Sequence, residues 1–244
     1  MPGFRRFYNI LRFGIGPDAR KRKKEAKIRA REQRFASDEW NHDERFATRR
    51  YHSYDQYLAH QASKLDRIET RLRETEADNL AAFRHRFKSC AALSGARSVL
   101  CLGARLGTEV QALHELGYFA VGIDLNPGPG NRYVLPGDFH HVVFPDQSID
   151  AIYCNALDHV FDLNRIVGEI VRLLRQGGVL IADLMPGYEE GAVPGEFETT
   201  HWRRSEDLLN EIINLGGFML IESHRAQGDH RRDRWLETTL RKSA

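Results

Sequence analysis

The sequence predicts an α/β fold with a seven-stranded, mostly parallel sheet, an antiparallel last strand and an all-helical N-terminal extension. Two observations lead to this fold class. After Ser94 and Gly95, short apolar runs alternate with stretches of helical periodicity, which is typical of a parallel sheet covered by helices. The last two apolar runs are joined by the polar segment 226–234, which leaves no room for a crossover helix, so they should pair as an antiparallel hairpin.

The elements of this sheet follow from the apolar pattern in chain order. Each strand is expected where a short apolar run is bounded by polar or glycine-bearing turns. The expected strands are 98–102, 120–124, 133–136, 149–154, 179–184, 218–223 and 235–240, and the expected helices between them are 108–116, 163–175 and 205–215.

The front of the chain has a different character. Residues 1–50 hold fifteen Lys and Arg against seven Asp and Glu. The stretch 17–34 is rich in helix formers with few apolar residues, which predicts an exposed helix. A second helix is expected from Ser53, a candidate cap with Gln56 three residues later, and a third over 77–93. We therefore expect an all-helical front.

These features divide the chain into a basic N-terminal extension (1–52), a helical lid or cap (53–94) and an α/β domain (95–244). The basic extension favours an anionic partner, either phospholipid head groups or nucleic acid, and a solvated helix is the alternative. The exposed helices before Ser94 could also form a homodimer.

Cysteine usage and hydropathy bear on the compartment. Cys90, Cys101 and Cys154 have no paired spacing and no C-x-x-C, which indicates neither disulfides nor a zinc site. No run approaches the roughly 20 apolar residues of a spanning helix. We expect a cytoplasmic protein, with peripheral membrane contact through its basic, aromatic start as a further possibility.

A candidate ligand site follows the first three strands of the α/β domain. Gly103 and Gly107 stand in the turn between the first strand and its helix, where backbone can approach a ligand closely. Asp124 ends the second strand, about twenty residues on, where a carboxylate can accept both hydroxyls of a ribose. Asp138 and Phe139 follow the third strand. Alone, the glycine pair is equally consistent with close helix packing.

The order of these and later motifs resembles the class I S-adenosylmethionine-dependent methyltransferases, in particular their small-molecule subgroup. The resemblance covers residues 98–184 and extends less specifically to about 96–240. It implies a Rossmann-like fold, S-adenosyl-L-methionine as cofactor, and methyl transfer as activity. The later motifs read Phe144-Pro145-Asp146-Gln147-Ser148-Ile149-Asp150, Leu157-Asp158-His159-Val160-Phe161-Asp162 and Leu173-Leu174-Arg175-Gln176-Gly177-Gly178-Val179.

The resemblance implies a role for each matching position. The glycine turn would pass under the methionine part of the cofactor, the acidic strand tip would hold the ribose, and the pair after the third strand would meet the adenine. The implied cofactor-binding residues are Gly103, Arg105, Gly107, Asp124, Leu125, Asp138, Phe139, Asn155 and Ala156.

Three positions depart from the family pattern. Cys101 stands where an acidic residue is usual, and Glu109 is a candidate replacement. Arg105 stands where a middle glycine is usual; its guanidinium could pair with the cofactor's carboxylate or point to solvent. The segment 126–132 offers prolines and glycines in place of a crossover helix, so the adenosine side would be open or covered by an N-terminal helix.

Methyl transfer is an in-line displacement at a sulfonium carbon, so no metal is required in principle. A base is needed only where the acceptor must lose a proton. The candidate catalytic residues are His159 and Asp158, with a loop-shaping role as the alternative for His159. Further candidates near the same sheet edge are His140, His141 and His201, with Trp202 in the expected acceptor roof (185–204) and Tyr54 and Tyr57 in the lid.

The expected reaction is methyl transfer to a small-molecule, sugar or lipid-linked acceptor. Two alternatives stay open. One is a nucleic-acid methyltransferase with a basic arm, which is disfavoured because Cys154-Asn155-Ala156-Leu157 does not resemble the tetrapeptide that holds a flipped base. The other is a non-catalytic binding protein that kept the fold, because fold alone does not settle function.

Overall fold

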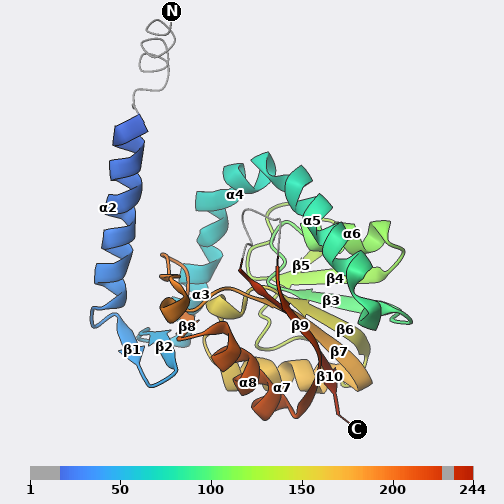
Figure 1. Cartoon of the computed structure of the whole chain (residues 1–244). Coiled ribbons are helices and arrows are strands. Elements are labelled where there is room, and N and C mark those ends of the chain that lie inside the picture. Colours follow the sequence, from blue (N-terminus) through green and yellow to red (C-terminus); the bar gives the residue numbers. More distant parts are fainter. Residues whose placement is uncertain (1–16, 227–233, 244) are drawn as a thin grey trace, which may run out of the picture.

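The computed structural model describes residues 17–226 and 234–243, and a seven-stranded sheet of order β5-β4-β3-β6-β7-β10-β9 lies at its centre (Figure 1). Only β10 runs antiparallel to its neighbours, β7 and β9, so the predicted fold class is confirmed. The strands are β3 (Ser98–Leu102), β4 (Phe119–Asp124), β5 (Val134–Pro136), β6 (Ile149–Cys154), β7 (Leu174–Leu184), β9 (Phe218–Arg225) and β10 (Leu236–Lys242).

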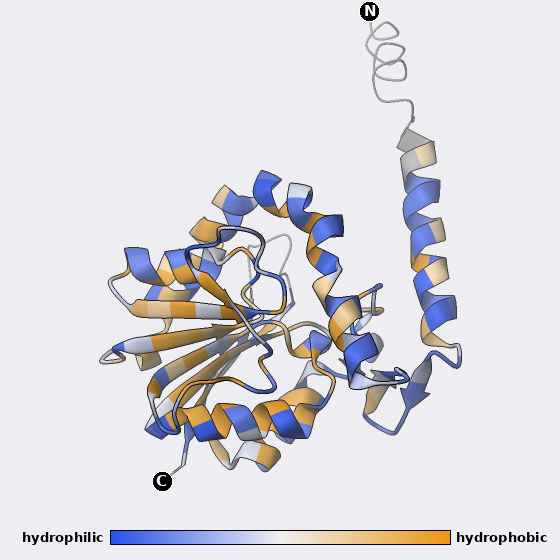
Figure 2. Ribbon diagram, turned by 180° about the vertical axis from the view of Figure 1, so that it is seen from behind, coloured by the Kyte–Doolittle hydropathy of each residue, from blue (hydrophilic) through white to orange (hydrophobic). Residues whose placement is uncertain are grey.

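Helices cover both faces of this sheet because successive strand side chains alternate between the faces. Leu100 and its neighbours pack with α7 (Leu163–Leu173) and α8 (Ser205–Gly216) in one core cluster. Val99 and Cys101 pack with α6 (Thr108–Glu115) and α5 (Glu76–Ser89) in the other. Figure 2 shows the apolar side of α7 turned towards the sheet.

The N-terminal helices reach the sheet edge from outside. The exposed helix α2 (Pro17–Phe35) stands away from the sheet and is mostly hydrophilic (Figure 2). The predicted second helix is present but breaks at Ser63 into α3 (Tyr54–Ala62) and α4 (Lys64–Glu74). Its predicted cap is confirmed, because the Ser53 hydroxyl accepts from the Gln56 backbone N–H at 3.2 Å.

The N-terminal extension contains helices as predicted, but two short strands interrupt them, so it is not all-helical. β1 (Trp40–His42) and β2 (Phe46–Arg49) form a small antiparallel sheet with β8 (Thr200–Trp202). The pairing partner of β2 lies about 150 residues away in sequence, so no local periodicity reveals it. This sheet fastens the N-terminal extension to the segment that follows β7.

The connection between β4 and β5 contains no helix, as its prolines and glycines predict. The α3–α4 junction lies against it instead. The Asn126 side-chain amide donates to the Ala62 carbonyl at 2.8 Å. The lid therefore covers the edge of the sheet at which β3 and β4 end. None of the described helices is long and apolar enough to span a membrane.

Candidate active site

Gly103 lets the turn after β3 pass close to its neighbours. Its φ is +72°, and a Cβ at this position would lie 2.6 Å from the Cβ of Ala156 and 3.7 Å from the Phe139 ring. A side chain here would therefore fill the space between three loops at the carboxyl edge of the sheet.

Asp124 ends β4 beside this turn. Its carboxylate accepts from the backbone N–H of Arg105 at 3.0 Å and from that of Asn126 at 2.9 Å. Burial raises the pKa of Asp124, and the two N–H groups oppose this shift by stabilising the ionised form. The carboxylate still lines a pocket, so it can accept further hydrogen bonds from a ligand.

The pocket beside Asp124, which we call the nucleoside pocket, joins the strand loops to the lid. On the side of the α/β domain, six of the predicted cofactor-binding residues line this pocket. On the other side it is lined by lid residues, of which only Tyr57 was a candidate from the sequence. The lining residues are Gly103, Arg105, Asp124, Leu125, Asn126, Phe139, Ala156, His159, Tyr57, Gln61, Lys64 and Leu65.

Asp138, which was predicted to meet the adenine, is turned away from the nucleoside pocket. It accepts from the Tyr54 hydroxyl at 2.5 Å and from the His140 backbone N–H at 2.9 Å. Burial would raise its pKa, but the hydrogen bonds from His140 and Tyr54 outweigh burial and hold the pKa lowered, at about 2. Asp138 thus fastens α3 to the domain.

Gly107 and Asn155 also lie outside the nucleoside pocket. A Cβ on Gly107 would lie 2.6 Å from that of Tyr133, so this glycine gives the start of α6 room to pack against the chain entering β5. Asn155 lines a second, larger cavity instead.

This second cavity has a volume of about 670 Å³ and shares Gly103, Arg105, Lys64 and His159 with the nucleoside pocket. We call it the acceptor cavity, after the group that the sequence analysis expects beside the cofactor. Its walls are α2, α4, the loop after β3 and residues 196–198. Of the segment 185–204, which was expected to roof the acceptor, residues 196–198 line this cavity.

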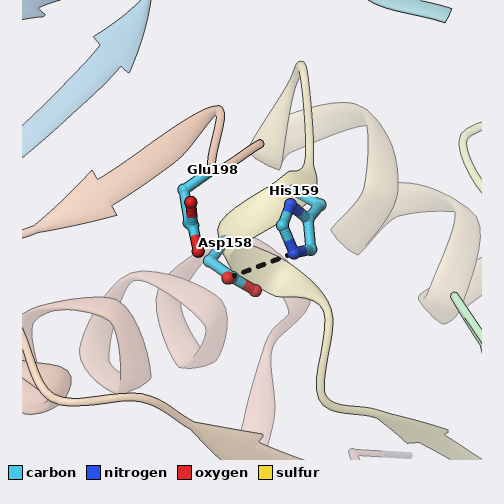
Figure 3. Close-up of side chains that lie close together, drawn as sticks. All are labelled: Asp158, His159 and Glu198. Atoms are coloured by element: carbon cyan, nitrogen blue, oxygen red, sulfur yellow. Dashed lines mark ion pairs between the residues drawn. The ribbon is translucent and has the colours of Figure 1, made fainter. Parts of the chain in front are cut away.

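His159 lies where the two cavities meet, within a cluster of polar side chains. Its Nδ1 lies 2.8 Å from the Phe197 carbonyl, which assigns the proton to Nδ1 and leaves Nε2 as a hydrogen-bond acceptor. Nε2 accepts from Lys64 and lies 3.3 Å from the Asp158 carboxylate. Figure 3 shows Glu198 approaching the same point from the segment before β8.

Burial shifts the pKa values of this cluster. Burial, with a contribution from Arg105, lowers the pKa of Lys64. Burial and Glu198 raise the pKa of Asp158. Burial and Lys64 lower the pKa of His159, which favours the neutral ring. Such shifted groups in a cleft are typical of functional sites.

Asp158, His159 and Glu198 offer ligand atoms within 4.8 Å of one another, a set that can hold a divalent cation. The Lys64 ammonium, however, already donates to His159 Nε2, the nitrogen that an ion would need. The three residues fit a metal only if Lys64 withdraws.

The other predicted bases lie elsewhere. The His140 ring bonds Asp138, and His141 is exposed. His201 and Trp202 are buried in β8, and the Trp202 indole N–H donates to the Met185 carbonyl at 2.9 Å. Neither His201 nor Trp202 lines the second cavity. They lie in β8, which is fixed by its pairing with β2, a contact that the sequence did not reveal.

Arg105 has an unusual backbone conformation. Its φ is +44°, in the left-handed region that favours glycine, and its side chain lines both cavities. Among the described residues, no carboxylate lies within salt-bridge distance of its guanidinium. A strained position that carries a long cationic side chain indicates a role for that side chain.

Residues 100–182 match a protein family model described as a methyltransferase domain. Among curated proteins, none matches the sequence. Among solved structures, the chain is similar to a 1,6-didemethyltoxoflavin N1-methyltransferase from Burkholderia thailandensis, which holds 1,6-didemethyltoxoflavin and S-adenosylhomocysteine. The TM-score is 0.64 at 20% identity, covering 84% of this chain and 100% of the other.

Two further structures have the same fold. One is a methyltransferase from Thermotoga maritima, with a TM-score of 0.58 at 15% identity over 76% of this chain and 100% of the other. The second is the [4+2]-cyclase SpnF, with a TM-score of 0.52 at 16% identity over 67% of this chain and 82% of the other. At these identities the likeness establishes the fold, and SpnF is named for a different reaction.

Proposed function

We propose that this chain, whose residues 100–182 match a methyltransferase domain, uses S-adenosylmethionine to methylate a small molecule held in the acceptor cavity. The observation that carries the proposal is the junction of the two cavities at Gly103, Arg105 and His159. A cofactor in one cavity would present its methyl group to an acceptor in the other. A volume of about 670 Å³ suits a small acceptor.

In this proposal the nucleoside pocket holds the adenosyl part of the cofactor. Asp124 accepts the ribose hydroxyls and Phe139 packs on the adenine. Arg105 pairs with the carboxylate at the methionine end, while Gly103 and Ala156 leave room for the sulfonium. Asp138 is not assigned to the cofactor, because its carboxylate is taken up by Tyr54 and His140.

The reaction is a displacement in which the acceptor's lone pair bonds to the methyl carbon, and the carbon–sulfur electron pair stays on sulfur. When the acceptor atom carries a proton, Lys64 is the base we propose. Its lowered pKa provides a neutral amine at lower pH than an exposed lysine does. His159 positions Lys64 through Nε2, and the carboxylates of Asp158 and Glu198 stabilise the resulting ammonium.

A sugar or lipid-linked acceptor remains within this proposal, and a nucleic-acid acceptor is less favoured because Cys154-Asn155-Ala156-Leu157 does not resemble the tetrapeptide that holds a flipped base. The non-catalytic alternative stays open because fold alone does not settle function, and SpnF, with the same fold, is named for a different reaction. A cytoplasmic location, peripheral membrane contact and a homodimer stay predictions, and the region 1–16 of the basic start lies outside the described residues.

Titration calorimetry with S-adenosylmethionine and S-adenosylhomocysteine tests the cofactor assignment. Asp124→Asn keeps the side chain's shape and removes the charge that accepts the ribose hydroxyls. We expect the affinity for both ligands to fall at least about 100-fold, which corresponds to about 2.7 kcal/mol. Asp138→Asn, the matched control, should change the affinity less than about threefold, which is under about 0.7 kcal/mol.

Unchanged affinity in Asp124→Asn, with a fold intact by circular dichroism, would contradict the assigned pocket. If the affinity for the two ligands falls equally in both variants, Asp138 belongs to the cofactor site, as the sequence predicted. No binding of either ligand to the parent chain would favour the non-catalytic alternative.

A further inference from the structure

The outer end of the acceptor cavity is strongly basic. Five of its lining side chains there are cationic, and four of these are arginines. They come from α2, which was otherwise an exposed helix, and from the outward turns of α4: Lys27, Arg31, Arg34, Arg67 and Arg71.

Few carboxylates balance these charges. Glu196 pairs with Arg67, and Glu39 lies 3.8 Å from Arg34 outside the cavity. Within 17–226 and 234–243, no carboxylate lies within salt-bridge distance of Arg31 or Arg71. The remaining lining acids are Glu109, Asp158 and Glu198. Asp158 and Glu198 gather at His159, and Glu198 also comes near Arg31 without reaching salt-bridge distance, because a Cβ on Gly195 would lie 2.7 Å from Glu198 Oε2 and 3.2 Å from Arg31 Nη2. Like charges held together without partners favour an anion between them.

Arg31 is held in place rather than loose in solvent. Its guanidinium packs against Gly195, where a Cβ would lie 3.2 Å from Nη2. It is only half-exposed, and it comes from a helix anchored near its end by the β1–β2–β8 sheet. Arginine presents a planar fork that bonds phosphate or carboxylate oxygens in pairs.

We infer that this outer end is an anion subsite, and that the acceptor carries a phosphate or carboxylate group which Arg31 and Arg71 bind while its other end lies at Lys64. This inference rests on the proposed function, because it names the class of acceptor for that site. The arrangement separates two tasks within one cavity. The basic end fixes the acceptor, and the less basic end near His159 receives the atom to be methylated.

The same anionic chemistry could be presented by a soluble phosphate ester or by a lipid head group. The cavity is lined by residues of α2 and α4, so either source would meet the same arginines. The probes below separate these sources.

Calorimetry of the full chain with inorganic pyrophosphate tests the subsite, with and without S-adenosylhomocysteine. Arg31→Gln/Arg71→Gln should weaken pyrophosphate binding at least tenfold and leave S-adenosylhomocysteine affinity within threefold. The matched control Lys23→Gln/Arg73→Gln removes the same charge from α2 and α4 at exposed positions outside the cavity, and should retain pyrophosphate binding.

Equal weakening in the two double variants, or no pyrophosphate binding by the parent chain, would overturn the subsite while S-adenosylhomocysteine binding still supported the proposed function. If the parent chain does not bind S-adenosylhomocysteine, the proposed function is wrong. The pyrophosphate affinities of the parent and the variants would still test the subsite in that case.

Flotation with phosphatidylglycerol vesicles and binding of a single-stranded RNA complete the test. Pyrophosphate should compete with any vesicle binding that depends on Arg31 and Arg71. Vesicle or RNA binding that depends on these residues but resists pyrophosphate would overturn a subsite within the cavity and assign the patch to a macromolecular surface.

Discussion

At the scale of single residues, Arg105 combines backbone strain with a position at the junction of the two cavities. A non-glycine residue in the left-handed region costs about 1 kcal/mol or more. The fold bears this cost where a glycine would avoid it. The presence of arginine at this position is therefore explained by a role of its side chain, because the turn alone would favour glycine.

Arg105→Gly should raise the free energy of unfolding by up to about 1 kcal/mol, because the backbone strain is relieved. The larger conformational entropy of glycine in the unfolded chain reduces this gain. It should also weaken S-adenosylmethionine binding at least about tenfold, or 1.4 kcal/mol, because the carboxylate partner is lost. Denaturant unfolding and calorimetry measure the two effects.

Gln147→Gly is the matched control, since Gln147 has a φ of +53° and is exposed. It should relieve strain in the same way without affecting the cofactor. If Arg105→Gly binds S-adenosylmethionine as tightly as the parent does, the assignment of Arg105 to the cofactor site is wrong.

Asp138 makes a pH-dependent contribution at the residue scale. Its pKa is lowered from 3.8 to about 2 in the folded chain. The stability it contributes is therefore present above about pH 4 and is lost as the pH falls through 2. The difference in unfolding free energy between the parent and Asp138→Asn should shrink over this interval when measured by denaturant unfolding. A difference that is constant with pH would show that the carboxylate's charge has no part in holding Tyr54.

At the scale of elements, the α3–α4 junction forms one wall of the nucleoside pocket. The Tyr57 hydroxyl donates to the His159 carbonyl at 3.0 Å, and Lys64 begins α4 directly after the break at Ser63. The break turns the chain, so that α3 lies over the domain loops while α4 borders the acceptor cavity. In the proposed function, the lid thus supplies the base as well as one wall of the nucleoside pocket.

With an identified acceptor, Lys64→Met should lower kcat about 100-fold or more, which is the usual contribution of a positioned base. In the parent, kcat should rise with pH through the Lys64 pKa, because only the neutral amine accepts a proton, and the variant should lose this rise. Affinity for S-adenosylhomocysteine should change little.

Arg73→Met, at the far end of the same helix and paired with Glu69, controls for general effects on α4. A Lys64→Met enzyme with the parent's kcat and pH profile would show that the acceptor needs no base or finds another one.

At the scale of the whole molecule, a buried ion pair joins the front of the chain to the sheet. The Arg86 guanidinium of α5 lies 3.0 Å from the Asp183 carboxylate of β7 and 3.2 Å from Glu237 of β10. Arg86 and Asp183 are both buried, and Tyr153 also donates to Asp183. The ion pair therefore fastens the last lid helix to the centre of the sheet.

Arg86→Met should destabilise the fold by about 3–5 kcal/mol, because it leaves the Asp183 charge buried without its main partner. The exposed pair of Arg84 and Glu115 on the same helix provides the control, and Arg84→Met should cost less than about 1 kcal/mol. Unfolding followed by tryptophan fluorescence and by far-ultraviolet circular dichroism should give coincident transitions. Separate transitions would show that the front of the chain unfolds on its own.

The sequence by itself determined the parts of this protein that depend on neighbouring residues. The strands of the sheet follow from short apolar runs whose side chains alternate between faces, and the Ser53 cap follows from its spacing to Gln56. Gly103 and Asp124 were predicted together because the carboxyl ends of adjacent parallel strands meet at one edge.

Only the tertiary structure decided what depends on residues far apart in the chain. The pairing of β2 with β8, the contact of Lys64 with His159 and the turning of Asp138 towards Tyr54 each join segments that local periodicity treats separately. A polar side chain has the same local pattern whether it faces a ligand or another part of the protein. The outcome depends on which groups the tertiary structure brings within hydrogen-bond distance, and for Asp138 these are the Tyr54 hydroxyl and the His140 backbone N–H.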